Sequence, residues 1–377
     1  MILSEDQRMM REAIRDFVTA EVLPHAARWD RDAEFPADAL RGLAALGCMG
    51  VAVPTSEGGS GLDYRSLALI LEEIAAGDGA LSTIVSVNNC PVCSILMAWA
   101  DPAQKQAWLT PLASGAMLGA FCLTEPQVGS QADGLTTRAE RIGEHYLING
   151  TKQFITSGKH ADVAIVMAVT DRNAGKKGIS AFIVPTDTPG YEVAGLERKL
   201  GQHASDTAQI RFTDCRIPVA NRLGEEGQGL KIALSGLEGG RIGIASQAIG
   251  MARAAFDAAL DYAHQREAFG VKIFQHQAVQ FRLADMATQI EAARQLVMHA
   301  ASLKDDGQPC LKQAAMAKLF ASEMAERVCS DAIQIHGGYG YVADFPVERI
   351  YRDVRVCQIY EGTSDIQRML IGRALAV

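Results

Sequence analysis

A carboxylate near the C-terminus has the surroundings of a general base. Glu361 lies within residues 359–367, between Tyr360, which offers an apolar wall, and Gly362, which leaves room for a ligand beside the backbone. A glutamate next to an aromatic ring, a glycine and the start of a helix can remove a proton from a substrate that reaches it. Taken alone, such a stretch is more often an ordinary turn with a solvated side chain, so both interpretations stay open.

The residues after Glu361 predict the element that positions it. Ser364 and Gln367 have the spacing of a capping box, which predicts a helix that begins at about Asp365. The inward face of this helix is expected to carry Ile366, Met369 and Leu370. Burial under a ligand would raise the pKa of Glu361 and the helix N-terminus would lower it, and the sequence leaves the balance open.

Two other segments have residues that could hold a planar heterocycle. Residues 121–130 (FCLTEPQVGS) offer a hydroxyl group at Thr124, backbone amides, and flexible points at Gly129 and Ser130. Residues 334–340 (QIHGGYG) contain adjacent glycines, which allow a ligand to approach the backbone closely. Without further context, residues 121–130 are simply a loop that enters a β domain.

Together the three segments resemble signatures of the acyl-CoA dehydrogenase family, in the family's order and at its usual distances. The resemblance runs along the whole chain, and the short-chain branch is the most similar. It implies an FAD enzyme of fatty acid or branched-chain amino acid degradation that converts a short straight or branched acyl-CoA to the trans-2-enoyl-CoA. In that reaction Glu361 would take the α-proton while the β-hydrogen leaves as hydride to flavin N5.

The resemblance also implies roles for individual residues. The FAD contacts carried over from the first flavin segments are Phe121, Leu123, Thr124, Gly129, Ser130, Phe154, Ile155 and Thr156. The remaining FAD contacts are Arg266, Phe269, Gln277, Gln334, Gly337, Gly338, Thr363 and Asp365. The substrate contacts are Ser130, Glu238, Arg241, Tyr360 and Gly362. Among these, Arg266 suits a pyrophosphate, because a guanidinium group donates two parallel hydrogen bonds.

The chain departs from the family's usual residues at a few positions. Phe154 stands where most members have tryptophan, Ser157 where they have asparagine, and Gln131 where an aspartate is usual. Phe154 can still stack on the flavin ring, with less area. Some members hold their catalytic glutamate at the position of Gly240, so a glycine there leaves Glu361 as the base.

Some of the implied FAD contacts, including Arg266 and Gln334, belong to a neighbouring subunit in the family, which implies a homo-oligomer, usually a tetramer. The family also passes its electrons to an electron-transfer flavoprotein. Two alternatives stay open. An acyl-CoA oxidase uses a similar base but lets oxygen reoxidise the flavin, and a catalytically silent subunit would bind flavin and CoA only.

Composition limits the other possibilities. The net charge of -8 is spread along the 377 residues without a basic block, which argues against nucleic acid and anionic membrane surfaces as partners. No apolar run is expected to approach the ~20 residues that span a bilayer, and no signal or transit peptide is recognised. The eight cysteines are scattered, so reduced thiols in the cytoplasm are expected. Cys90 and Cys93 have redox-motif spacing in an apolar stretch, which favours buried structural thiols over a metal site.

The pattern along the chain predicts an α+β protein of three domains. Residues 1–118 are expected to form an N-terminal helical domain, 119–228 a central β domain, and 229–377 a C-terminal helical bundle. Strands are predicted near 145–158, 161–169, 179–185 and 209–217 from Val, Ile and Phe runs between turn residues. Long helices are predicted over 241–266, 275–304 and 311–335, with the segment 237–243 at a helix start.

Overall fold

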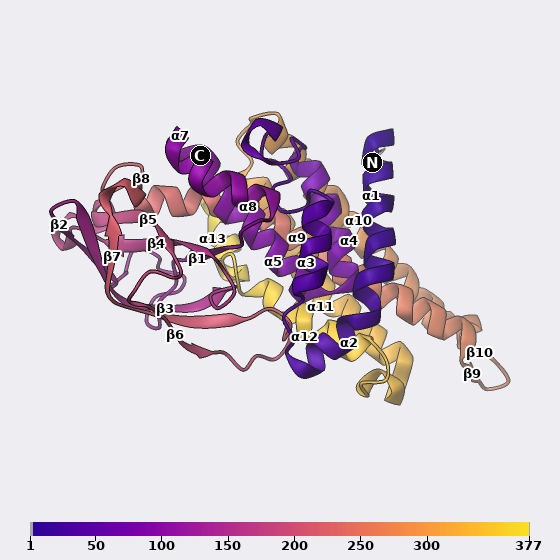
Figure 1. The fold of residues 1–377 in the computed structure, drawn as a ribbon. Helices are drawn as coiled ribbons and strands as arrows, with labels where there is room; N and C mark the ends of the chain where they lie inside the picture. Colours follow the sequence, from indigo (N-terminus) through magenta and orange to yellow (C-terminus); the bar gives the residue numbers. More distant parts are fainter. Residues whose placement is uncertain (1–2, 377) are drawn as a thin grey trace.

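The computed structural model describes residues 3–376, and its elements follow the predicted order of helices, strands and helices (Figure 1). The N-terminal part is built from α1 (Glu5–Phe17), η1 (Val18–Val22), α2 (Leu23–Asp32), α3 (Ala37–Ala45), η2 (Thr55–Glu57), α4 (Tyr64–Gly77), α5 (Gly79–Val87), η3 (Asn88–Cys93), α6 (Ser94–Trp99), α7 (Pro102–Gln104), η4 (Lys105–Leu109) and α8 (Thr110–Ser114). Ser4 and Gln7 form a capping box at the start of α1.

The expectation that no apolar run is long enough to span a bilayer was wrong for Gly79–Trp99, which contains α5, η3 and α6. Its 21 residues have a mean hydropathy of 1.5, which by length and composition would suffice to cross a membrane. However, 83% of the window is buried inside the protein, as in the core helix of a folded domain. The prediction that Cys90 and Cys93 are buried is confirmed, and both thiols are unpaired.

The central part is one sheet of eight strands, in the order β6-β7-β3-β2-β4-β5-β8, with β1 paired in parallel to β4. The elements are β1 (Gly119–Cys122), β2 (Arg138–Ile142), β3 (His145–Thr156), β4 (Val163–Val169), η5 (Arg172–Gly178), β5 (Ile179–Pro185), β6 (Tyr191–Leu196), β7 (Thr207–Pro218), η6 (Val219–Asn221) and β8 (Arg222–Leu223). The four predicted strands correspond to β3, β4, β5 and β7. β4 and β5 are buried along almost their whole length because both faces of the sheet are covered there.

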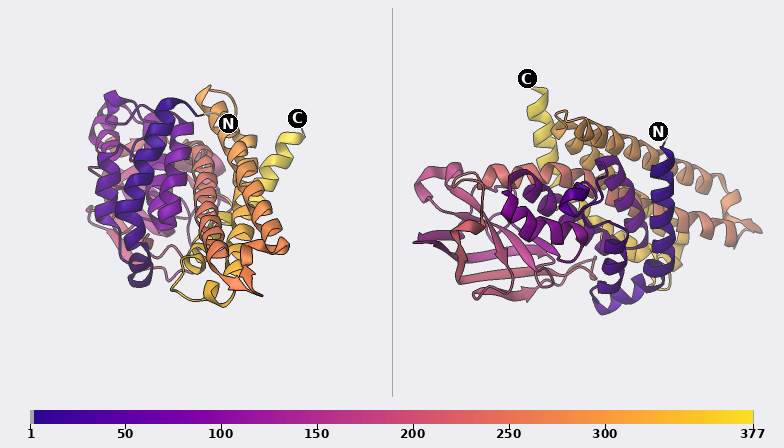
Figure 2. Two further views of the ribbon diagram at one scale, coloured as in Figure 1. Left: turned by 90° about the vertical axis from the view of Figure 1, so that its right-hand side faces the viewer. Right: turned by 45° about the horizontal axis from the view of Figure 1, so that its top comes forward.

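The C-terminal part begins with the longest helix, α9 (Gly229–Gln265). It continues with β9 (Glu267–Ala268), β10 (Val271–Lys272), η7 (Ile273–Gln275), α10 (Gln277–Asp305), α11 (Leu311–His336), η8 (Gly337–Tyr341), α12 (Val347–Val354), η9 (Arg355–Gln358) and α13 (Ser364–Leu375). Alanine side chains dominate the core between α9 and α11, so the helices can approach closely. Ala68, Leu69 and Ala75 of α4 share this core, and Figure 2 shows the N-terminal and C-terminal helices side by side, with the sheet at one end.

The start of α9 differs from the prediction. Residues 237–243 lie inside the helix, not at its start, because α9 begins at Gly229. Its glycines allow close packing: a Cβ atom at Gly236 would lie 2.6 Å from Pro91, and one at Gly250 would lie 2.2 Å from the carbonyl oxygen of Glu72. Tertiary packing therefore overrides the low helix propensity of glycine here.

The helix after Glu361 exists, but its cap and its buried face were predicted wrongly. Thr363 is the N-cap, and its hydroxyl group accepts a hydrogen bond from the amide of Ile366, so the cap lies one residue before Ser364. Met369 is 40% exposed, and the fully buried side chain of α13 is that of Gln367. Gln367 faces inward because it donates hydrogen bonds to the turn that carries Glu361.

Candidate active site around Glu361

The carboxyl group of Glu361 faces the middle of α9. Glu361 lies between η9 and α13, and its φ of 55° and the φ of 88° at Gly362 place both residues in the left-handed region. A Cβ atom at Gly240 would lie only 2.7 Å from Oε1 of Glu361. Glycine on α9 therefore leaves the space that the carboxyl group occupies. Oε2 of Glu361 is buried and has no hydrogen-bond partner, so this oxygen is free to accept a proton.

Burial is the strongest influence on the carboxyl group of Glu361. Burial raises the pKa of Glu361 to about 7, and the positive charges of Arg241 and Lys318 oppose that rise. Arg241 comes from α9 and Lys318 from α11, so both opposing charges are side chains of neighbouring helices. A carboxyl group with a pKa near neutrality is well matched to proton abstraction at physiological pH. Lys318 was not recognised as a site residue, since a lysine within a helical pattern gives no sign that it is buried.

Tyr360 is anchored by its hydroxyl group as well as by its ring. The hydroxyl donates a hydrogen bond to Oε1 of Gln247 on α9 and accepts one from Nε2 of Gln202 at 3.4 Å. Nε2 of Gln247 also donates to the carbonyl oxygen of Gly79 at 2.6 Å. The residue before Glu361 is thus tied to α9, to α5 and to the segment between β6 and β7.

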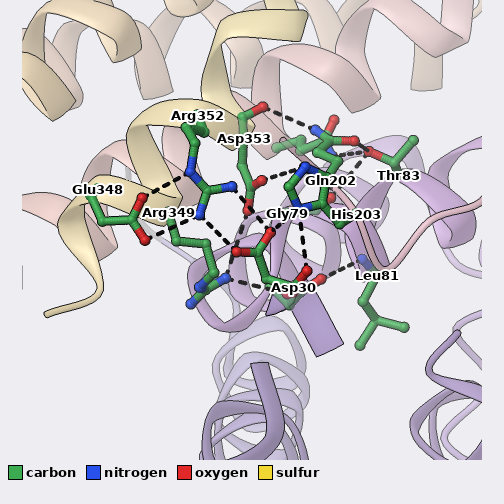
Figure 3. Close-up of polar contacts among 12 residues, drawn as sticks. Asp30, Gly79, Leu81, Thr83, Gln202, His203, Glu348, Arg349, Arg352 and Asp353 are labelled. Atoms are coloured by element: carbon green, nitrogen blue, oxygen red, sulfur yellow. Dashed lines mark hydrogen bonds and ion pairs between the residues drawn. The ribbon is translucent and has the colours of Figure 1, made fainter. Parts of the chain in front are cut away.

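These contacts continue into a buried polar network where three parts of the chain meet (Figure 3). Asp353 of α12 accepts a hydrogen bond from the backbone amide of Gln202 and lies 3.7 Å from the guanidinium group of Arg349, which also contacts Asp78 at 3.3 Å. Burial raises the pKa of Asp353 to about 7 against the charge of Arg349. At the edge of the network Arg352 makes a two-bond ion pair with Asp30, with distances of 3.2 and 2.7 Å.

A cleft of about 420 Å³ lies beside the same part of α9. Its lining residues are Tyr64, Ser94, Ala98, Ser235, Glu238 and Lys304. The carboxylate of Glu238 accepts a hydrogen bond from Lys304 at 3.2 Å, whereas Arg241 is only 5% exposed and lies toward Glu361. Arg241 also feels the charge of Glu238 three residues earlier on α9, so the two predicted substrate contacts lie between the cleft and Glu361.

The loop of residues 121–130 is held by a buried ion pair. Nζ of Lys152 donates to Oε1 of Glu125 at 2.9 Å and to the carbonyl oxygen of Leu123 at 3.0 Å, and both charged side chains are buried. Burial alone would raise the pKa of Glu125. The charge of Lys152 and hydrogen bonds from Thr136 outweigh burial and lower this pKa to about 2. The amide of Gln153 donates to the carbonyl oxygen of Thr124, which joins this loop to the segment around Phe154.

Two of the departures from the family pattern have left-handed backbone conformations. Phe154 and Ser157 each have a φ of 58°. Phe154 is 62% exposed and its ring is available to a ligand, whereas Ser157 is fully buried and its hydroxyl group has no partner. Non-glycine residues in the left-handed region are often found at ligand-binding and active sites. The third departure, Gln131, is exposed, and nothing in the structure explains it.

Of the remaining predicted FAD contacts, Thr363 and Asp365 lie beside Glu361 at the start of α13. The others, which are Arg266, Phe269, Gln277, Gln334, Gly337 and Gly338, lie toward the other end of the molecule. The β9–β10 hairpin is opposite the sheet in Figure 1. Its tip residue Phe269 is 97% exposed, and the guanidinium group of Arg266 lies 5.9 Å from the ring centre of Tyr339. A Cβ atom at Gly337 or Gly338 would meet no atom within 4 Å. The structure brings Arg266 together with the segment of Gly337 and Gly338, but not with Phe121 or Phe154.

This donor set is suited to FAD. No carboxylate in the described part of the chain pairs with Arg266, so its guanidinium group is free for a phosphate. The open glycines would let a cofactor approach the backbone. Within residues 3–376 no group of three His, Cys, Asp or Glu side chains could hold a metal ion.

Comparison with known proteins decides the family. Residues 4–116, 120–215 and 227–376 match the N-terminal, middle and C-terminal domain models of acyl-CoA dehydrogenase. The chain belongs to the acyl-CoA dehydrogenase family. It is therefore an FAD-dependent oxidoreductase that acts on CH–CH bonds, and its three-domain fold is that of the family.

Individual acyl-CoA dehydrogenases are similar over the whole chain. The mitochondrial short-chain specific enzyme of Homo sapiens is 47% identical over 98% of this chain and 90% of its own length. Butyryl-CoA dehydrogenase of Megasphaera elsdenii superposes with a TM-score of 0.97, at 41% identity, and all of both chains is covered. A chain in the structure described as the electron transferring flavoprotein of Acidaminococcus fermentans gives a TM-score of 0.98 at 44% identity, over 100% of this chain and 99% of that one.

Proposed function

We propose that this acyl-CoA dehydrogenase removes the α- and β-hydrogens of a short-chain acyl-CoA, straight or branched, with Glu361 as the base. The observation that carries the proposal is the buried, unpartnered Oε2 of Glu361, in a carboxyl group whose pKa is about 7. Such an oxygen can accept the α-proton of a thioester bound beside α9. When bound, FAD accepts the β-hydrogen together with its electron pair, and the product is the trans-2-enoyl-CoA.

The backbone of Glu361 offers the donor that this reaction needs. Loss of the α-proton places negative charge on the thioester oxygen, and a positioned N–H group stabilises that charge as in an oxyanion hole. The amide of Glu361 makes no hydrogen bond within the described residues, so it is available. The left-handed conformation at Glu361 and Gly362 sets the direction of this amide relative to the carboxyl group.

The cleft beside Glu238 is our proposed route for the CoA part of the substrate. Tyr64 lines the cleft, and its ring lies 3.0 Å from the position of a Cβ atom at Gly239, next to the glycine that faces Glu361. Lys304 at the cleft is paired with Glu238 at 3.2 Å, so it would bind an anionic carrier only by leaving that carboxylate.

We further propose that FAD is held by two copies of the chain, in a homo-oligomer that is a tetramer, and that an electron-transfer flavoprotein accepts the electrons. One set of predicted FAD contacts lies on the sheet side of the molecule and another lies beside the β9–β10 hairpin at the opposite end, which supports FAD binding by two copies. The match to a chain in a structure described as an electron transferring flavoprotein supports the proposed electron acceptor. A cytoplasmic location is part of this proposal, since eight unpaired, buried cysteines suit a reducing compartment.

The substrate class is tested by steady-state rates with straight and branched acyl-CoAs. Relatives named short-chain specific and butyryl-CoA dehydrogenase support a preference for four carbons. We expect a higher kcat/KM for four-carbon or short branched substrates than for a twelve-carbon substrate, measured with an artificial electron acceptor. A higher value for twelve carbons would overturn the short-chain assignment, and no turnover with any acyl-CoA would leave only a binding role.

A further inference from the structure

Two fully buried side chains hold the turn that carries Glu361. Nζ of Lys318 donates a hydrogen bond to the carbonyl oxygen of Gly362 at 2.8 Å. Nε2 of Gln367 donates to the same oxygen at 2.8 Å and to the carbonyl oxygen of Glu361 at 3.1 Å. A left-handed conformation at a non-glycine residue such as Glu361 is strained and persists only when its surroundings fix it. These hydrogen bonds from α11 and α13 therefore stabilise a turn that the local sequence does not favour.

Lys318 is an unusual residue for a purely structural contact. It is fully buried, and no carboxylate of the described chain makes an ion pair with it. Burial lowers its pKa to about 8, while Cys357 and Glu361 oppose that change. A buried ammonium group with a single carbonyl partner is costly, and a neutral side chain of similar length would avoid that cost.

The groups around Glu361 are few, so the contribution of Lys318 can be separated. Arg241 faces it from α9, Lys318 from α11, and the thiol of Cys90 from η3. On its own segment, Tyr360 directs its hydroxyl group away to Gln247. Only Arg241 and Lys318 carry positive charge, and of these only Lys318 also bonds to the turn itself.

We propose that Lys318 is a positioning residue for Glu361: it fixes the catalytic turn through the carbonyl group of Gly362, and its charge favours the ionised carboxylate. The inference rests on the proposed role of Glu361 as the base. It assigns two separable effects to Lys318, one geometric and one electrostatic. Gln367 shares only the geometric effect, because it binds the same carbonyl oxygen without a charge.

The experiment measures the rate of flavin reduction by a four-carbon acyl-CoA, without oxygen, from pH 5.5 to 9. In the wild-type holoenzyme this rate should rise with pH through an apparent pKa near 7, because Glu361 must be ionised. Lys318→Met removes the charge and the donor at similar length. The rising limb, which is the part of the pH profile where the rate increases with pH, should then move to higher pH by at least about one unit. This is the lower end of the effect of a nearby opposite charge on a pKa. The rate at pH 6 should therefore fall about tenfold.

Two variants separate charge from geometry. Gln367→Met should lower the rate at every pH and leave the rising limb in place, because it removes hydrogen bonds to the turn but no charge. Lys318→Arg keeps the charge, so its limb should stay close to that of the wild type. Lys312→Met, on the same helix, controls for net charge and should change neither rate nor limb.

An unshifted rising limb in Lys318→Met would overturn the proposed electrostatic effect of Lys318. Equal shifts in Lys318→Met and Lys312→Met would also overturn it, because the shift would then come from net charge and not from the position of Lys318. If Lys318→Met does not retain flavin, Lys318→Gln is measured with the same expected shift. Failure of the underlying function is distinguishable, since it would appear as wild-type flavin reduction by Glu361→Gln, whatever the Lys318 variants do.

Discussion

Glu361 combines a buried carboxylate with two buried cations, and the balance between them sets how it can react. Burial alone would keep the carboxyl group protonated, and Arg241 and Lys318 alone would make it a weak base. The net result is a group that changes charge near neutral pH. Its free oxygen and the glycine at position 240 then provide a reactive atom and the space in front of it.

At the scale of residues, the assignment of Glu361 as the base stays a prediction, and the sequence did not indicate the groups that surround it. Glu361, Tyr360 and Gly362 were recognisable because they are contiguous. Lys318 and Gln247 come from other helices, and their burial depends on packing that no local pattern encodes. The contact expected from a capping box was also shifted by one residue, because Thr363 and Ser364 can both cap a helix and only the three-dimensional turn selects Thr363.

At the scale of elements, prediction succeeded where the hydrophobic pattern was strong. β3, β4, β5 and β7 follow runs of β-branched and apolar residues, and all four were predicted. β2 and β6 were missed because most of their residues are exposed, so neither run looks like a half-buried strand. The β6 edge strand pairs only with β7 and needs little burial to persist.

The buried network around α12 gives a prediction for stability. The folded-state pKa of Asp353 is raised above its ordinary value of 3.8, to about 7. The folded state therefore favours the protonated form, and this contribution is complete below about pH 4 and is lost as the pH rises toward 7. Asp353→Asn removes the titration, so its unfolding free energy should improve relative to wild type as the pH rises across that range.

Chemical denaturation at a series of pH values measures this difference. Asp344→Asn, at an exposed aspartate in the segment before α12, is the control and should run parallel to wild type. A constant offset between Asp353→Asn and wild type from pH 4 to 7 would contradict the account, because the aspartate would then be ionised throughout.

At the scale of the whole molecule, the important fact is the separation between the two sets of predicted FAD contacts. The sheet and the β9–β10 hairpin lie at opposite ends of the molecule (Figure 1). This separation supports the proposal that one copy places Phe154 and Arg266 on different FAD molecules. The sequence could suggest this only through family resemblance, since nothing in its local patterns gives the distance between the two ends.

Arg266→Ala tests the arrangement between subunits. The variant loses a charged partner for the pyrophosphate but leaves Glu361 untouched, so FAD should be released more readily while the bound fraction keeps its rate of reduction. The flavin-to-protein absorbance ratio after gel filtration measures retention. Arg138→Ala, at an exposed arginine of β2, is the matched control and should retain FAD as wild type does. Unchanged retention in Arg266→Ala would contradict the cross-subunit contact.

The measurement that tests the central claim most directly is anaerobic flavin reduction by a four-carbon acyl-CoA in Glu361→Gln. Glutamine keeps the shape of the side chain and removes only the proton acceptor, so FAD content and acyl-CoA binding should persist. A positioned base contributes about 10²–10⁴ in rate, so the account predicts that reduction slows at least about a hundredfold. Reduction at the wild-type rate would contradict it, because another group would then have to remove the α-proton.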